Sequence, residues 1–105
     1  MQIALYHNHY DKKHLAQVTD DMKRLGTPTI RAIWSECYGM WLAVEGCHRL
    51  RAAQVLGLVP TISEINIDDE PTIILQNDGD DEETNTLDLA IGLTDEAYTK
   101  HTLTF

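Results

Sequence analysis

The sequence predicts a small domain of mixed helices and strands, of the α/β or α+β class. A chain of 105 residues suffices for one domain of 1–105 and is too short for two. Its 43% apolar content can fill a hydrophobic core. Helical and strand-like spacings of apolar residues follow one another up to residue 67, in the order strand, helix, strand, strand, helix, strand.

The first helix is predicted over residues 12–25. Asp11 is a suitable N-cap, and Gly26 is a natural C-terminal stop. Apolar residues at spacings of three, four and three form one helical face: Leu15, Val18, Met22 and Leu25. A second helix is predicted from about His48 to Leu56.

The strands are predicted from β-branched and aromatic residues. Residues 2–6 form a short strand, and 29–34 and 40–44 form a hairpin turning at 37–39. Both hairpin arms are almost wholly apolar, which indicates strands covered on both faces, with Trp34 and Trp41 in the hairpin core rather than stacking on bases. Residues 61–67 alternate in polarity and predict another strand.

The C-terminal extension, residues 68–105, is acidic and weakly patterned. Residues 72–75 form a short apolar run of strand or helix type, and 77–83 an acidic, solvated loop without the spacing of a calcium site. Leu87, Ala90 and Ile91 suggest a short helix, and residues 94–98 suggest another.

Charge is unevenly distributed along the chain, whose formal net charge is −9. Residues 52–99 contain no Lys or Arg but 12 of the 17 acidic residues. Since DNA-binding proteins neutralise phosphates with Lys and Arg, we expect no autonomous DNA binding. The basic first half could hold a small anion, and the acidic second half could bind a basic protein partner.

Cellular location is predicted from the absence of two signals and from the cysteines. The chain has no apolar run of membrane-spanning length and no signal-peptide start, so we expect a cytoplasmic protein without membrane contact. Cys37 and Cys47 are placed by the predicted hairpin on the order of 20 Å apart, too far for a disulfide. Free thiols fit a reducing compartment.

The turn from the second hairpin strand into the second helix is the candidate site. A helix N-terminus presents backbone N–H groups and partial positive charge, to which phosphates bind. Gly46 permits close approach, while His48, Arg49 and Arg51 add donors and charge. At this position Cys47 could be a nucleophile with a lowered thiol pKa. The plainer alternative is a packing cysteine and solvated arginines.

Metal binding is not predicted. His7 and His9 could share one side of a strand and join His14 or an acid as ligands. No fourth ligand follows at a standard spacing, so exposed histidines are the better interpretation.

Residues 44–58 resemble the ParB/sulfiredoxin superfamily. Gly46-Cys47-His48-Arg49-Leu50-Arg51-Ala52 fits the Gly-x-His-Arg-x-x-Ala pattern of ParB-type domains, and sulfiredoxins carry Gly-Gly-Cys-His-Arg. Upstream, residues 15–18 and 26–30 are similar to the helix-and-strand opening of ParB domains. Downstream, residues 57–62 match their exit strand, so the likeness covers about residues 12–67.

The resemblance implies an α+β domain with a mixed sheet and helices packed on it. It also implies that ATP or CTP, with magnesium, binds through its phosphates at the turn. The phosphate-binding residues implied by position are Gly46, Cys47, His48 and Arg49, with Arg51 on the same turn. In sulfiredoxins the cysteine matching Cys47 attacks the phosphorylated sulfinic acid of an oxidised peroxiredoxin.

Three functions follow from this resemblance and from the charge pattern. The first is a stand-alone ParB-like domain that binds a nucleotide, with or without phosphotransfer or hydrolysis. The second is a cysteine sulfinic acid reductase using Cys47. On the first helix, however, His14, Gln17 and Asp21 replace the Lys, Ser and Thr by which sulfiredoxins hold ATP. The third is a non-enzymatic phage or plasmid accessory protein.

Overall fold

A mixed five-stranded sheet forms the centre of the fold. The computed structural model describes residues 1–5, 10–75, 82–90 and 102–105. Strands lie side by side in the order β4-β2-β3-β1-β7. Their bounds are β1 (Gln2–Ala4), β2 (Thr29–Ser35), β3 (Met40–Ala43), β4 (Thr61–Glu64) and β7 (Thr102–Thr104).

The predicted hairpin is confirmed, and its two strands each gain a parallel neighbour. β2 and β3 pair antiparallel from Ser35 opposite Met40 to Ala32 opposite Ala43. β1 lies parallel to β3, and β4 lies parallel to β2. β7 pairs antiparallel with β1, so the two chain ends lie together, and the Met1 ammonium donates to the Phe105 carbonyl at 2.7 Å.

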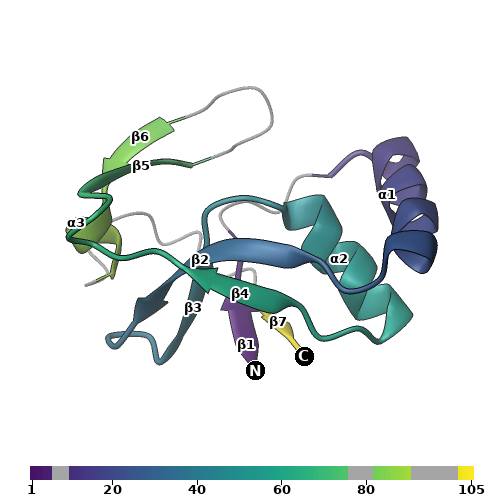
Figure 1. The fold of residues 1–105 in the computed structure, drawn as a ribbon, viewed down its shortest axis with the longest axis horizontal. Coiled ribbons are helices and arrows are strands. Elements are labelled where there is room, and N and C mark those ends of the chain that lie inside the picture. The colour runs from purple at the N-terminus through teal and green to yellow at the C-terminus, as the bar shows by residue number, and fades with distance from the viewer. Residues whose placement is uncertain (6–9, 76–81, 91–101) are drawn as a thin grey trace.

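Two helices cover one face of the sheet (Figure 1). They are α1 (Lys12–Leu25) and α2 (Cys47–Leu56). α2 packs on the sheet directly, since Leu50 is fully buried with Ile3 and Ile30. α1 packs on α2 through Met22, which lies against Ala52 and Ala53. The expected sheet with helices packed on it is therefore present.

The opposite face is covered by a small hairpin and a short helix (Figure 1). β5 (Thr72–Leu75) pairs antiparallel with β6 (Glu82–Asn85), and α3 (Thr86–Ala90) follows. Ile73, Leu75 and Leu89 pack with sheet residues in one apolar cluster. The C-terminal extension thus contributes Ile73, Leu75 and Leu89 to the core, a point that the sequence left open.

Several predicted boundaries shift in the structure. The helix at 12–25 is confirmed with both caps: the Asp11 carboxylate accepts from the backbone of Lys13, and the Gly26 N–H donates to the Met22 carbonyl. The strand predicted at 61–67 ends at Glu64, so the prediction is wrong for its last three residues. The Asn66 side chain accepts from the Asp68 N–H at 2.9 Å and turns the chain away from β2.

The prediction of an acidic loop at 77–83 is wrong for its last two residues. Glu82 and Glu83 belong to β6, opposite Leu75 and Ile74. Their backbone hydrogen bonds in the hairpin outweigh the polar composition that predicted a loop. The run at 72–75 is a strand, and the short helix predicted near Leu87 is α3. The rest of the loop, from 77 to 81, and the helix predicted at 94–98 lie outside the described residues.

Candidate functional site

The turn between β3 and α2 depends on a glycine. Gly46 is the N-cap of α2, with a left-handed backbone at φ 75° and ψ 30°. A Cβ atom on Gly46 would lie 2.7 Å from Cδ1 of Ile30 and 3.2 Å from Nη2 of Arg49. Glycine is needed here both for its backbone conformation and for the space it leaves. Gly46 provides no side-chain acceptor for the backbone N–H groups at the start of α2.

Arg49 folds back over this turn. Its Nη1 donates to the Thr29 carbonyl at 3.1 Å, and its Nη2 lies 3.6 Å from Oε1 of Glu45. The close approach to the Cα of Gly46 follows from the ordinary tilt of helical side chains toward the N-terminus. The side chain remains 41% exposed, so its guanidinium is both held in place and accessible to a ligand.

The starts of α1 and α2 meet at His48. The Asp11 N–H, at the N-cap of α1, donates to Nε2 of His48 at 3.1 Å. The His14 ring contacts the His48 ring edge to face, with centroids 4.5 Å apart. Because Nε2 accepts a hydrogen bond, neutral His48 carries its proton on Nδ1 in this arrangement. Two helix N-termini, each with partial positive charge, therefore lie at one place.

Asp11 already supplies one negative charge there. Its carboxylate accepts from the backbone N–H groups of His14 at 3.1 Å and Lys13 at 2.8 Å. These two hydrogen bonds hold the pKa of the exposed Asp11 carboxyl below its ordinary value of 3.8, and the bond from His14 has the larger effect. Asp11 is thus ionised at neutral pH and caps α1, while the start of α2 has no comparable acid in its first turn.

Arg51 follows Arg49 by two residues on α2 and contacts a different partner. Its guanidinium carbon is 4.7 Å from the centre of the Tyr10 ring, in cation–π geometry. Tyr10 immediately precedes the α1 N-cap. Arg51 therefore joins α2 to the start of α1.

Cys47 is placed differently from the other predicted site residues. Its side chain is only 6% exposed and packs in the apolar cluster with Ile3, Ile30 and Leu50. A thiol that attacks a substrate has to be reached by it, and this thiol is directed into the core. Cys37 is exposed at the hairpin turn, and both cysteines are free thiols, as expected.

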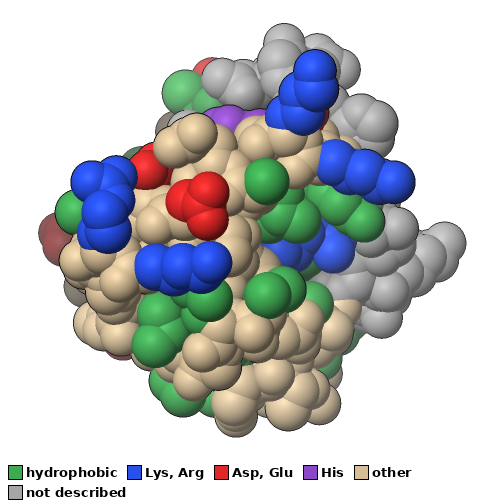
Figure 2. Space-filling model, turned by 90° about the vertical axis from the view of Figure 1, so that its right-hand side faces the viewer, with side chains coloured by type: hydrophobic (Ala, Val, Ile, Leu, Met, Phe, Trp, Pro, Cys, Tyr) green, Lys and Arg blue, Asp and Glu red, His purple; other side chains and the backbone are tan. Residues whose placement is uncertain are grey.

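Positive charge gathers on the helix side of the molecule. Six of the eight Lys and Arg residues belong to α1 and α2, four on the first helix and two on the second. Figure 2 shows this side, with Lys and Arg side chains spread around apolar ones and histidine at the margin. Three of these six cations have a carboxylate partner on the same side: Lys23 pairs with Asp20, Arg24 with Asp21 and Arg49 with Glu45.

Sequence reasoning missed Tyr10 and Asp11 as part of this arrangement. Asp11 could be identified as a cap, but nothing in the spacing pairs it with His48, 37 positions away. Among the described residues no group of three potential metal ligands is found. His14 lies against His48, while His7 and His9 are outside the described residues.

No protein-family model, curated protein or solved structure matches the chain. In the described part of the chain, no helix is both long and apolar enough to cross a membrane. The family suggested by residues 44–58 is therefore a prediction. The observed architecture is an α+β fold with a mixed sheet and, among the described residues, three helices.

Proposed function

We propose that this protein is a ParB/sulfiredoxin-like domain that binds the phosphates of ATP or CTP, with magnesium, at the start of α2. One observation carries the proposal: the Arg49 guanidinium lies over Gly46 at the point where α1 and α2 both begin. The family resemblance supplies the identity of the anion, and the geometry supplies a physical reason for binding it.

The chemistry of the turn suits a phosphate. Gly46 leaves no side chain between an incoming oxygen and the first turn of α2. Arg49 can offer two parallel donors to phosphate oxygens.

Glu45 is the residue against which a phosphate would compete. Its carboxylate is the ion-pair partner of Arg49 at 3.6 Å and is itself 24% exposed. A bound phosphate would repel this carboxylate unless magnesium lay between them. We therefore expect magnesium to tighten binding and the Glu45→Gln variant to depend less on it.

Binding, rather than catalysis, is the activity proposed. Cys47 is 6% exposed, which does not favour the attack by its thiol that a sulfinic acid reductase would need. The Cys47→Ser variant should therefore bind nucleotide as the parent does.

Calorimetric titration with ATP and with CTP, each with magnesium, tests the proposal. Arg49→Ala should weaken binding by about 10- to 100-fold, the effect of losing a charge-assisted hydrogen-bonded pair. Arg24→Ala is the matched control, because Arg24 is exposed near the C-terminal end of α1 with Asp21 as its partner. A parent protein that binds neither nucleotide, or an Arg49→Ala variant that binds as well as the parent, would contradict the proposal.

A further inference from the structure

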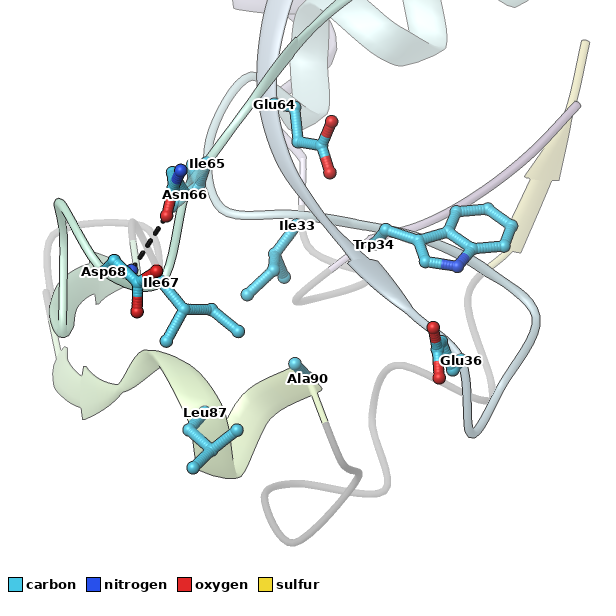
Figure 3. Close-up of a pocket in the computed structure, with 10 residues that line it drawn as sticks. All are labelled: Ile33, Trp34, Glu36, Glu64, Ile65, Asn66, Ile67, Asp68, Leu87 and Ala90. Carbon is cyan, nitrogen blue, oxygen red and sulfur yellow. Dashed lines mark hydrogen bonds between the residues drawn. The ribbon is translucent and has the colours of Figure 1, made fainter.

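A second candidate site lies at the edge of the sheet where β4 ends, away from the Gly46 turn. A pocket of about 830 Å³ opens between the end of β2, the segment after β4, and α3. Figure 3 shows Ile33, Ile67 and Leu87 around its interior, with Ala90 beside them. Leu87 is 50% exposed although it is apolar. The volume lies within the range of ligand-binding pockets.

One wall of this pocket is a stretch of β2 without a neighbouring strand. β4 pairs with β2 only as far as Ala32 opposite Glu64, and the last bond is from the Ile65 N–H to the Ala32 carbonyl at 2.9 Å. Beyond it the turn at Asn66 carries the chain away from β2. Within the described ranges, no strand pairs with β2 on this side after Ala32.

The backbone of Trp34 points into the resulting gap. The Arg31 carbonyl accepts from the Val44 N–H, on the β3 side, and the Ala32 carbonyl is directed to the β4 side. Successive residues of a strand direct their backbone groups to alternate sides, so Trp34 follows Ala32. Its N–H and carbonyl are thus available to an added strand, and Trp34 is among the residues that line the pocket.

The margin of the pocket is acidic. Glu36, Glu64 and Asp68 line it and are exposed. None of its described lining residues is Lys or Arg. Glu64 is two positions from Ile62, whose side chain packs on the helix side, so Glu64 lies on that side of the gap.

These features together specify an extended basic peptide. Side chains of an added strand alternate between two faces. One set would enter the apolar interior near Ile67 and Leu87, and the other would emerge on the side of Glu64. Lys or Arg at the emerging positions would complement the acidic margin, and apolar residues would fill the interior.

We propose that the gap beside the end of β2 binds an extended, basic segment of a partner protein by β-strand addition at Trp34. Two main-chain hydrogen bonds fix its position, an alternating apolar set of side chains contacts Leu87, and the basic set faces Glu64. This site is separate from the nucleotide turn and does not depend on it.

Binding of the peptide acetyl-Lys-Val-Lys-Val-Lys-Val-amide to the full chain tests this proposal. Measurement in about 150 mM salt screens long-range attraction to the acidic protein. Glu64→Lys and Leu87→Arg should each weaken binding by about five- to tenfold. Both residues are exposed, so both variants are expected to fold, and circular dichroism checks that they do.

Asp20→Lys on α1 is the matched control for Glu64→Lys, because it makes the same change of net charge at an exposed position outside the pocket. It should leave peptide affinity within about twofold. A peptide with Ser in place of Val, and one with N-methylated backbone at alternate residues, should both lose binding. Equal weakening by Asp20→Lys and Glu64→Lys, undiminished binding of either altered peptide, or no binding of the parent peptide would overturn the proposal.

Discussion

The two sides of the central sheet differ in charge, although each has its own apolar cluster. The helix side carries most of the cations, and its apolar cluster is built around Leu50. The hairpin side is built around Leu89, and the described residues of β5, β6 and α3 contain no Lys or Arg. The two helices, within residues 12–56, cover one side, and the described parts of residues 65–90 cover the other, so charge separated along the sequence is also separated in space.

Under the two proposals above, one small sheet carries two surfaces suited to opposite ligands. Salt screens charges over about 10 Å, so each side acts largely through its own local charge rather than through the net charge of −9. An anion is expected at the start of α2, and a basic peptide at the open edge of β2 beyond β4. The predictions below test how each side is held on the sheet.

The largest effect is expected at the Gly46 turn on the helix side. Gly46→Ala should lower the free energy of unfolding by about 2–5 kcal/mol, because it adds left-handed backbone strain to a contact with Ile30. Gly39→Ala is the control: φ is +65° there, with no atom within 4 Å of the added Cβ. It should cost about 1–2 kcal/mol. Urea unfolding measures both, and equal losses would show that the close approach at Gly46 has no energetic effect.

A smaller loss of stability is expected where a hydrogen bond joins α3 to the end of β2. The buried Ser35 hydroxyl donates to the Ala90 carbonyl at 2.8 Å and accepts from the Tyr38 N–H at 3.2 Å. Ser35→Ala should cost about 1–3 kcal/mol, since it leaves the buried carbonyl without this donor. Ser63→Ala, at an exposed strand position, should change stability by less than about 0.5 kcal/mol. A Ser35→Ala variant as stable as Ser63→Ala would rule out this anchoring role.

The ion pair between Arg31 and Glu70 should contribute still less. It joins β2 to the segment before β5, and its side chains are 43% and 44% exposed. Glu70→Gln should lower stability by no more than about 1 kcal/mol, with most of the loss removed in high salt. Asp69→Asn, at the exposed neighbouring position, serves as the control in the same denaturation experiment. A loss that persists in high salt would indicate an effect other than this ion pair.

The smallest effect is a pH dependence at the start of α1. The folded-state pKa of Asp11 is lowered from 3.8, so its contribution to stability is present above that pH and is lost as the pH falls through the lower folded value. Asp11→Asn keeps a capping acceptor but removes the charge. Its thermal midpoint should lie below that of the parent at pH 6, and the difference should shrink toward pH 3. A difference that stays constant over this range would contradict the assignment.

Local patterns in the sequence were sufficient for much of the helix side. Helix α1 follows from one apolar face, an Asp cap and a terminal glycine, all within a few residues of one another. The β2–β3 hairpin follows in the same way from two apolar strands and a short turn. The hairpin side was harder to predict. β6 is stabilised by pairing with β5 rather than by its own acidic composition.

For the candidate turn, the sequence likewise predicted the location of the site but not the arrangement of its side chains. Its glycine and basic residues follow from the residue types at the strand-to-helix junction. The direction of each side chain does not, because it depends on neighbours far away in the chain. Arg49 reaches the Thr29 carbonyl, and the thiol of Cys47 packs near Ile3.

The sequence by itself determined the α1 helix, the hairpin, the glycine turn before α2 and the separation of charge between the two halves of the chain. Only the tertiary structure decided that the N-terminal ends of both helices meet at His48. It also decided that β7 completes the sheet beside β1 and that β4 leaves β2 without a neighbour after Ala32. The physical reason is range. Capping and apolar periodicity act between residues close in the chain, whereas parallel pairing and core packing join residues that only the folded chain brings together.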